Sequence, residues 1–140
     1  MLPIKGGVVT FPYGKKYFTG GIHKGIDYRA VVGTPVYAAV SGTVVHAGRH
    51  LYRRGWGWAF GIHVIVDNVR FPNGSAGLWA GYCHLSLVEV YVGQKIVKGD
   101  LVGLSGKTGN VTGAHLHFQI LSQRTWNSTK HRNPAKWISA

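Results

Sequence analysis

The chain has 140 residues, with 16 Lys or Arg, four Asp or Glu and one cysteine, and its net charge at neutral pH is +12. One cysteine excludes an internal disulfide and a cysteine-rich zinc site, and four carboxylates without a paired motif disfavour a glycosidase, which needs two acids across one bond. The length suits a single domain over residues 1–140, and the surplus of cations predicts an anionic partner: nucleic acid, a membrane surface or a bacterial cell-wall polymer.

Short apolar runs separated by glycine dominate the chain. Glycine supplies 21 of the 140 residues, about twice the usual share of roughly 7%, and this pattern is typical of an all-β domain with many tight turns. No apolar run reaches the roughly 18 residues of a membrane-spanning helix. The first seven residues lack the apolar stretch of a secretory signal, so we expect either no export by the general route or a signal that has been removed.

Residues 1–22 are rich in glycine, lysine and aromatic side chains, and they predict an irregular segment that leads into the domain. His23 and Asp27 follow, four residues apart. That spacing would share one face of a helix, but the neighbouring glycines make a helix unfavourable. A bend at Gly25 could instead bring both side chains to one ion. By themselves, the two residues are read as a surface polar pair.

The middle of the chain is interpreted as a series of short strands. The expected strands cover residues 36–40, 43–47, 61–67, 78–85, 88–92, 96–97 and 101–104. A Pro-Asn-Gly turn within residues 71–74 predicts a hairpin. His46 and His50 are expected in a solvated loop, and His63 is expected to be structural because no ligand-like partner accompanies it.

Cys83 and His84 are neighbours on the strand expected over residues 78–85. Adjacent residues of a strand point to opposite faces, so the two cannot act together as nucleophile and base. If His84 faces a functional site, Cys83 is therefore expected to face the core and to be inert.

Two histidines one residue apart, His115 and His117, begin a strand expected over residues 115–121. Side chains at i and i+2 of a strand share a face and lie roughly 6 to 7 Å apart, so one imidazole can bind a metal while the other stands beside the open coordination position. Alone, such a pair fits ordinary half-buried strand residues equally well. The C-terminal tail, residues 122–140, is expected to pack its aromatic side chains back on the domain, with a binding patch as the alternative.

Together, the chain offers His23, Asp27 and His117 with two further imidazoles, His84 and His115. Three neutral or anionic nitrogen and oxygen ligands with a vacant fourth position are typical of catalytic zinc, whereas structural zinc is closed by four protein ligands. The two remaining histidines are suited to proton transfer and to stabilising an oxyanion beside such a metal.

With these motifs in their order, the chain resembles the lysostaphin-type zinc endopeptidases, also called β-lytic metallopeptidases, which cut peptide bonds in bacterial peptidoglycan. The resemblance runs from about Phe11 to Leu121. The matching segments are Gly20–Tyr28, Gly33–Ala38, Gly42–Val44, Cys83–Ser86, Val92–Gly99 and Thr112–Phe118.

The resemblance implies a compact, mostly antiparallel β fold, a sheet or barrel-like sandwich with an open groove. It also implies one Zn²⁺ per chain, held by His23, Asp27 and His117. His84 and His115 would then be the catalytic pair: one takes a proton from the zinc-activated water and passes it to the leaving amine, and the other donates a hydrogen bond to the oxyanion. The family often has an aromatic hydroxyl near the site, for which Tyr13 and Tyr17 are both candidates.

Two other function classes compete with the endopeptidase. A catalytically inactive wall-binding or activator module of the same fold is the first, although all five site residues are present. A nucleic-acid binder is the second, suggested by the charge, but no motif of a nucleic-acid-binding fold accompanies it and the basic residues are scattered. We therefore expect peptidoglycan and anionic wall polymers as partners, no specific nucleic acid, no membrane span and a monomer.

The biological setting is also an expectation. A catalytic domain that starts at a methionine without a signal suggests a bacteriophage endolysin, made in the host cytoplasm and released to the wall at lysis, or an enzyme carried by the virion. A secreted bacterial autolysin or bacteriocin domain is the alternative. The bond that is cut stays open.

Overall fold

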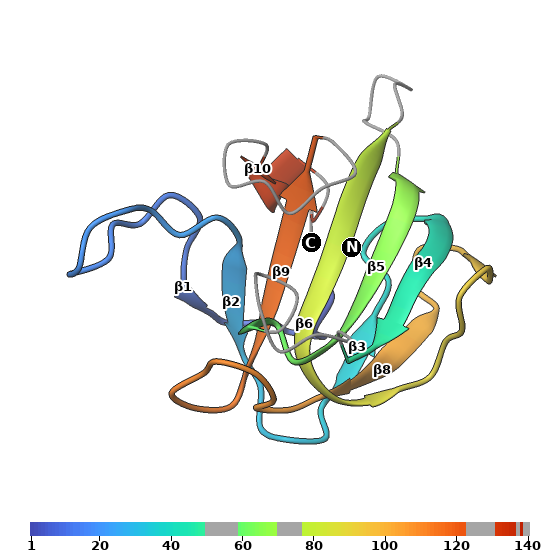
Figure 1. Cartoon of the computed structure of the whole chain (residues 1–140), viewed down its shortest axis with the longest axis horizontal. Helices are drawn as coiled ribbons and strands as arrows, with labels where there is room; N and C mark the ends of the chain where they lie inside the picture. The colour runs from blue at the N-terminus through green and yellow to red at the C-terminus, as the bar shows by residue number, and fades with distance from the viewer. Residues whose placement is uncertain (50–58, 70–76, 123–130, 137, 139–140) are drawn as a thin grey trace.

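The computed structural model describes residues 1–49, 59–69, 77–122, 131–136 and 138, and these residues form a twisted sheet of antiparallel strands (Figure 1). The strands are β1 (Val9–Phe11), β2 (Ile26–Arg29), β3 (Pro35–Tyr37), β4 (Gly42–Gly48), β5 (Ile62–Val69), β6 (Leu78–Val88), β7 (Lys95–Ile96), β8 (Leu101–Ser105), β9 (His115–Leu121) and β10 (His131–Arg132). A 3₁₀ turn, η1 (Pro134–Lys136), follows β10. The all-β, antiparallel fold expected from the sequence is confirmed. Within the described ranges, no helix is long and apolar enough to cross a membrane.

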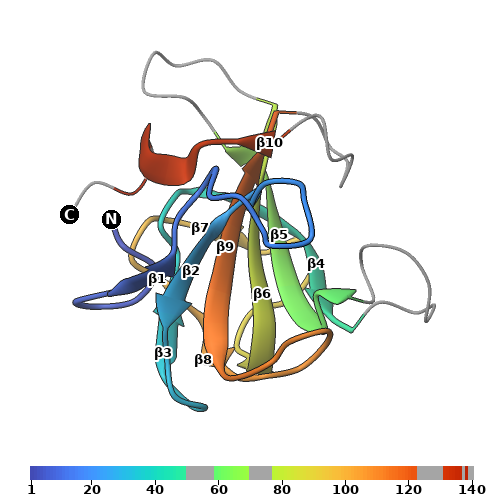
Figure 2. The ribbon, with the colours of Figure 1, turned by 90° about the vertical axis from the view of Figure 1, so that its left-hand side faces the viewer.

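The long central strand β6 organises the sheet. The main path runs β1-β2-β9-β6-β5-β4-β7, and each neighbouring pair is antiparallel. The C-terminal part of β6, from Leu85 to Val88, pairs with β8, which in turn pairs with β3. β10 pairs with the end of β9. Figure 2 shows how the sheet twists as β2, β9, β6, β5 and β4 follow one another.

Alternation along the strands separates an apolar core from a polar face. On the central strands β2, β6 and β9, every second side chain enters the core. These core side chains are Ile26, Tyr28, Ala80, Tyr82, Leu116, Phe118 and Ile120. The residues between them, including Asp27 and His117, therefore lie on the opposite face of the sheet, where the candidate site is built.

Three expected elements differ from the structure. The segment over residues 1–22 is not wholly irregular, because β1 lies within it and pairs with β2. The strand expected over residues 36–40 ends at Tyr37, because the backbone of Ala38 bonds to the loop before β8 instead. No separate strand covers residues 88–92, because Val88 is the last residue of β6 and the chain then turns away.

The tail is described in part. Residues 131–132 form β10 against β9, and Ile138 is 9% exposed within the core cluster, so the described end of the tail packs back on the domain. The hairpin turn predicted within residues 71–74, the predicted loop residue His50 and residues 123–130 of the tail lie outside the described residues.

Candidate metal centre

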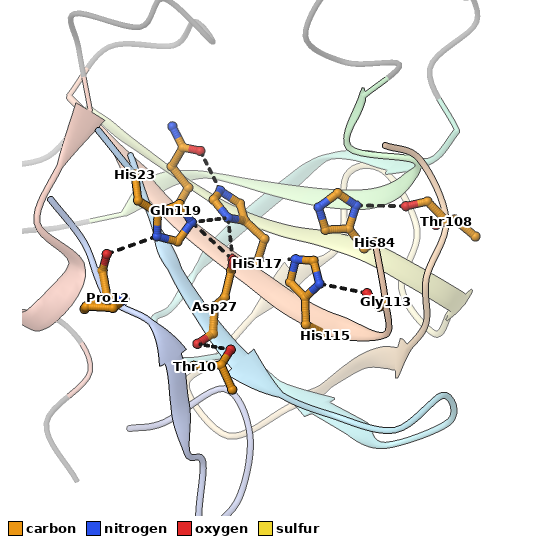
Figure 3. A network of polar contacts seen from close by, with 10 residues as sticks. All are labelled: Thr10, Pro12, His23, Asp27, His84, Thr108, Gly113, His115, His117 and Gln119. Carbon is orange, nitrogen blue, oxygen red and sulfur yellow. Dashed lines mark hydrogen bonds and ion pairs between the residues drawn. The ribbon is translucent and has the colours of Figure 1, made fainter. Parts of the chain in front are cut away.

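Three potential metal ligands converge on the polar face of the sheet (Figure 3). Nε2 of His23 lies 3.2 Å from Nδ1 of His117 and 3.2 Å from Oδ1 of Asp27, and Nδ1 of His117 lies 2.9 Å from the same oxygen. Two ligand atoms of a tetrahedral zinc ion with bonds of 2.0 to 2.1 Å are separated by about 3.3 Å. The spacing of the three atoms therefore fits one small cation bound by all three.

The hydrogen bonds on the outer side of each imidazole assign its tautomer. Nδ1–H of His23 donates to the carbonyl oxygen of Pro12 at 3.1 Å, and Nε2–H of His117 donates to Oε1 of Gln119 at 2.9 Å. The inner nitrogen of each ring is then left as a lone pair. Two lone pairs and a carboxylate of Asp27 facing one point repel each other unless a cation lies between them, so the donor set itself fits a metal.

Strand register brings Asp27 and His117 together. The two residues are directly opposite each other where β2 pairs with β9. His23 precedes β2 and reaches the same point because Gly25 allows close approach: a Cβ there would lie 2.7 Å from the His117 ring and 2.5 Å from the carbonyl oxygen of Phe118. The glycine is therefore required for space between the chain and the metal site, rather than for an unusual backbone angle.

The Asp27 carboxylate is held in its charged form. Burial raises the pKa of this carboxyl, but in the metal-free protein hydrogen bonds from His117 and His23, made when the nitrogen facing Asp27 carries a proton, outweigh burial and hold the pKa well below its usual range. Asp27 is therefore an anion at every pH at which the imidazoles are neutral, which is the state required for metal binding.

Gln119 extends the site beyond its three potential ligands. It follows His117 by two residues on β9, is 4% exposed, and its amide oxygen accepts the Nε2–H of the imidazole. Such outer partners orient a ligating histidine and fix its tautomer. Gln119 was not among the site residues predicted from the sequence, although its position two residues after His117 on one strand face was the available signal.

Removing the Gln119 amide is expected to weaken metal binding. Gln119→Leu leaves Nε2–H of His117 buried without an acceptor, so zinc affinity should fall by about 10- to 100-fold. Competition with a chromophoric chelator measures this change. Gln94→Leu is the matched control, since the Gln94 amide accepts a backbone hydrogen bond from Tyr91 in a turn. Equal zinc affinity in wild type and Gln119→Leu would contradict the assigned role.

His84 and His115 stand beside the three potential ligands, with ring centroids 4.9 Å apart (Figure 3). Nδ1–H of His84 donates to the carbonyl oxygen of Thr108 at 2.8 Å, and Nδ1–H of His115 donates to that of Gly113 at 3.0 Å. Nε2 of His115 lies 3.6 Å from Oδ1 of Asp27. Both rings are thereby left with Nε2 available for proton transfer or hydrogen bonding beside the metal site.

A β-bulge in β6 determines where His84 points. Ile62 pairs with Leu85 and Val64 pairs with Tyr82, so two residues of β6, Cys83 and His84, oppose one residue of β5. His84 has φ 64, in the left-handed region that non-glycine residues rarely adopt. Bulges of this kind redirect a side chain, often next to a functional site.

The bulge corrects the expectation for Cys83. Cys83 pairs with His117 across β6 and β9 and is fully buried, whereas Tyr82 and Leu85, but not Cys83, belong to the core cluster. Cys83 is therefore buried on the same face of the sheet as His117, and the bulge turns His84 to that face as well instead of to the opposite one. Burial, with the nearby Asp27 charge, raises the pKa of this thiol well above its usual value, so Cys83 stays protonated.

Burial also lowers the pKa of His84, to about 4, against the opposing effect of the Thr108 hydrogen bond. In the unfolded chain the pKa of His84 is near 6.5, so between pH 4 and pH 6.5 the unfolded chain binds more protons at this residue than the folded chain does. Stability of the metal-free protein should therefore fall as pH decreases from about 6.5 to about 4, by up to about 3 kcal/mol from this group. Thermal unfolding at several pH values tests this: His84→Gln should show a smaller pH dependence, and an equal one would contradict the prediction.

The two candidate tyrosines lie in different places. Tyr17 packs edge-on against His23 with centroids 5.9 Å apart and lines the groove at the metal site. The hydroxyl of Tyr13 is instead hydrogen-bonded to Nδ1 of His131 at 2.7 Å, and Tyr13 packs against the core. The structure therefore brings Tyr17, and not Tyr13, to the candidate site.

An open groove of about 750 Å³ runs over the metal site. Its walls combine the five candidate residues with the loop before β9. The lining residues are Tyr17, Thr19, His23, Asp27, Ala59, Phe60, His84, Asn110, Val111, Thr112, His115 and His117. A smaller hollow of about 280 Å³ adjoins the metal site on the side of Gln119 and Lys24. The groove and the hollow share Tyr17, Phe60, His23 and His117, so the two spaces meet at the metal site.

His46 and His63 lie outside this site. His46 is on β4, not in a loop as expected, and its ring stacks on that of His63 with centroids 4.1 Å apart. His63 is 1% exposed and its Nδ1–H donates to the carbonyl oxygen of Gly61 at 2.8 Å. The packing of these two rings is consistent with the structural role expected for His63.

Comparison with known families identifies the chain. Residues 21–134 match Peptidase family M23, and this range contains the three potential metal ligands and both neighbouring histidines. The chain belongs to peptidase family M23. The resemblance to lysostaphin-type enzymes that the sequence motifs indicated is therefore confirmed.

Curated M23 relatives are much longer than this chain. Lysostaphin of Staphylococcus simulans is 38% identical over 123 residues, which are 88% of this chain and 22% of lysostaphin. The peptidoglycan DD-endopeptidase ShyA of Vibrio cholerae is 36% identical over 113 residues, which are 80% of this chain and 23% of ShyA. The chain thus spans about a quarter of the length of the curated relatives it matches.

Solved M23 structures share the fold. The catalytic domain of lysostaphin from Staphylococcus simulans has a TM-score of 0.77 at 29% identity, covering 97% of this chain and 95% of that one. The catalytic domain of a mutant of the prophage-encoded M23 protein EnpA from Enterococcus faecalis has a TM-score of 0.71 at 31% identity, covering 95% of this chain and 92% of that one. A zinc-containing peptidase from Vibrio cholerae has a TM-score of 0.69 at 27% identity, covering 95% and 40%.

Proposed function

We propose that this M23 chain is a zinc metalloendopeptidase that hydrolyses peptide bonds of bacterial peptidoglycan. The observation that carries the proposal is the convergence of Nε2 of His23, Oδ1 of Asp27 and Nδ1 of His117 within 3.2 Å of one another at the floor of an open groove. Lysostaphin and the DD-endopeptidase ShyA, among its relatives, support the substrate class, and the zinc-containing neighbour supports the metal.

His23, Asp27 and His117 would hold the metal, and the side chains around it would transfer protons and stabilise the oxyanion. A zinc ion held there supplies a Lewis acid that polarises a carbonyl oxygen and acidifies water. His84 and His115 each have Nδ1–H bonded to a backbone carbonyl, which leaves Nε2 free to act, so one can accept a proton from water and deliver it to the leaving amine. The other can donate a hydrogen bond to the developing oxyanion.

Tyr17 is proposed as an additional hydrogen-bond donor to the substrate. Its ring packs against Phe11, with centroids 5.0 Å apart, and against His23, while 43% of the residue is exposed and it lines the groove. Burial, with the nearby Asp27 charge, raises the pKa of the Tyr17 hydroxyl, so the hydroxyl keeps its proton at neutral pH. A protonated hydroxyl at this position can donate to a carbonyl or oxyanion of the bound peptide.

The net charge of +12 supports a wall-bound setting for the enzyme. Anionic wall polymers would attract the domain through a sequence-independent interaction that weakens at high salt. We propose a monomeric enzyme of bacteriophage lysis, present in the host cytoplasm until lysis or carried by the virion, and the prophage origin of EnpA supports this. A reporter fusion expressed without a holin tests the setting: export of the reporter by the host alone would favour the secreted alternative.

Hydrolysis of purified peptidoglycan tests the proposed activity. Wild-type chain loaded with zinc should release fragments with new amine termini, and mass spectrometry of those fragments identifies the bond, whether in a glycine bridge, at a D-alanine linkage or in another cross-bridge. The chelated protein should release none. If the zinc-loaded chain binds several wall types and cuts none of them, the inactive binding or activator module becomes the better description.

A further inference from the structure

Thr108, in the loop between β8 and β9, joins three parts of the fold. Its hydroxyl accepts a hydrogen bond from the backbone N–H of Ile62 at 3.0 Å and donates one to the carbonyl oxygen of Leu85 at 2.7 Å. Its own carbonyl oxygen accepts Nδ1–H of His84 at 2.8 Å (Figure 3). One residue thus connects the start of β5, the bulged part of β6 and the His84 ring.

The backbone around Thr108 leaves little room for movement. A Cβ on Gly61 would lie 2.5 Å from the Thr108 hydroxyl oxygen, and Gly61 has a φ of +64, in the left-handed region that favours glycine. The backbone N–H of Asn110 donates to the carbonyl oxygen of Ala59 at 2.9 Å. The loop is therefore fastened against residues 59–62 at Thr108 and again at Asn110, and these contacts hold the Thr108 carbonyl oxygen in position.

His84 needs such support because its backbone is strained. A left-handed conformation of a non-glycine residue persists only where the surroundings determine it. The backbone N–H of His84 donates to the carbonyl oxygen of Phe60 at 2.9 Å, and the next carbonyl, that of Leu85, accepts the Thr108 hydroxyl. Thr108 thus holds the bulge through its hydroxyl and orients the His84 ring through its carbonyl oxygen.

We propose that Thr108 is a positioning residue of the active site, whose hydroxyl fixes the loop and the bulge so that its carbonyl oxygen directs Nε2 of His84 toward the substrate. Thr108 acts through His84 and not on the substrate itself. This inference rests on the proposed function for its effect on rate, but the orientation of the His84 ring can be measured without catalysis.

The kinetic test uses Thr108→Val and Thr108→Ser in the full, zinc-loaded chain. Valine keeps the shape but removes both hydroxyl hydrogen bonds, and serine keeps the hydroxyl. We expect kcat of Thr108→Val to fall by about 10- to 100-fold, because small misplacements of a catalytic group have effects of this size. KM and zinc content should stay unchanged, and Thr108→Ser should retain kcat within about threefold. The substrate is a soluble peptide that spans the bond identified on peptidoglycan.

Thr34→Val is the matched control, since the Thr34 hydroxyl also donates to a backbone carbonyl, that of Val31 at 2.7 Å, in a turn before β3. It should leave kcat unchanged. An unchanged kcat in folded Thr108→Val, an equal loss in Thr34→Val, or a loss of zinc from Thr108→Val would each overturn the proposal. Thr108→Ala, judged by the same measures, replaces the valine variant if that variant fails to fold.

Nuclear magnetic resonance separates the positioning role from the proposed activity. The Nδ1–H proton of His84 should give a protected, hydrogen-bonded resonance in wild type and Thr108→Ser, and this resonance should be lost or broadened in Thr108→Val. The same protected resonance in all three proteins would overturn the proposal. If wild type shows this resonance but hydrolyses no wall, the proposed function fails while the assignment of Thr108 as the residue that orients His84 stands.

Discussion

Replacing Asp27 by asparagine is expected to abolish zinc binding and peptidoglycan hydrolysis together. Asp27 is the one anion among the three potential ligands, and its Oδ1 lies within 3.2 Å of both ligating imidazole nitrogens. Asparagine keeps the shape but removes the charge, so two neutral imidazoles and a neutral amide, which binds zinc more weakly than a carboxylate, would remain around the ion. Because loss of an outer partner alone lowers affinity by about 10- to 100-fold, loss of this ligand should lower it by at least about 100-fold.

Zinc content after dialysis, chelator competition and release of wall fragments measure this result. Asp100→Asn is the matched control, since it removes the same charge at a turn where the carboxylate accepts the backbone N–H of Val97 at 2.9 Å. The control should bind zinc and hydrolyse the wall as wild type does. If Asp27→Asn retained full zinc affinity, the carboxylate would not be a metal ligand, whatever the activity.

The strand β9 shows how much of the site local sequence can predict. Its observed bounds, His115–Leu121, are those expected. The two histidines alternate with Leu116 and Phe118, and a polar–apolar alternation with a period of two is typical of a strand with one face in the core. That His115 and His117 share the polar face followed from the same alternation. Local sequence did not show that β2 would lie beside β9 with Asp27 opposite His117, since strand register depends on long-range packing.

His84 and Cys83 show where the same reasoning fails. Strict alternation assigned them to opposite faces, but the bulge against β5 places one extra residue in β6, so both lie on the polar side. A bulge of this kind depends on the register of two strands and on the contacts of Thr108 and Phe60, which are distant from β6 in sequence. No sequence pattern within residues 78–85 indicates those contacts.

A shared arrangement of the four site histidines connects the fold to the chemistry. Each ring donates one N–H to a neutral oxygen, three of them backbone carbonyls and one the amide of Gln119. Neutral acceptors fix the tautomer without adding negative charge, so among the described residues Asp27 is the one anion at the centre. The four rings thereby direct four lone pairs to one groove, which is the arrangement that the proposed metal binding and proton transfer require.

Replacing His115 by alanine is expected to remove activity but not zinc. His115 is not among the three converging ligands, and its Nε2 lies 3.6 Å from the Asp27 carboxylate on the groove side. Loss of a general acid or base slows reactions by about 10² to 10⁴-fold, so wall hydrolysis should fall by this factor while one zinc per chain is retained. His46→Ala is the matched control, because the His46 ring also bonds to a carbonyl two residues away, that of Gly48 at 2.8 Å. Loss of zinc from His115→Ala would place this histidine among the ligands, and unchanged hydrolysis would remove it from the catalytic pair and leave proton transfer to His84.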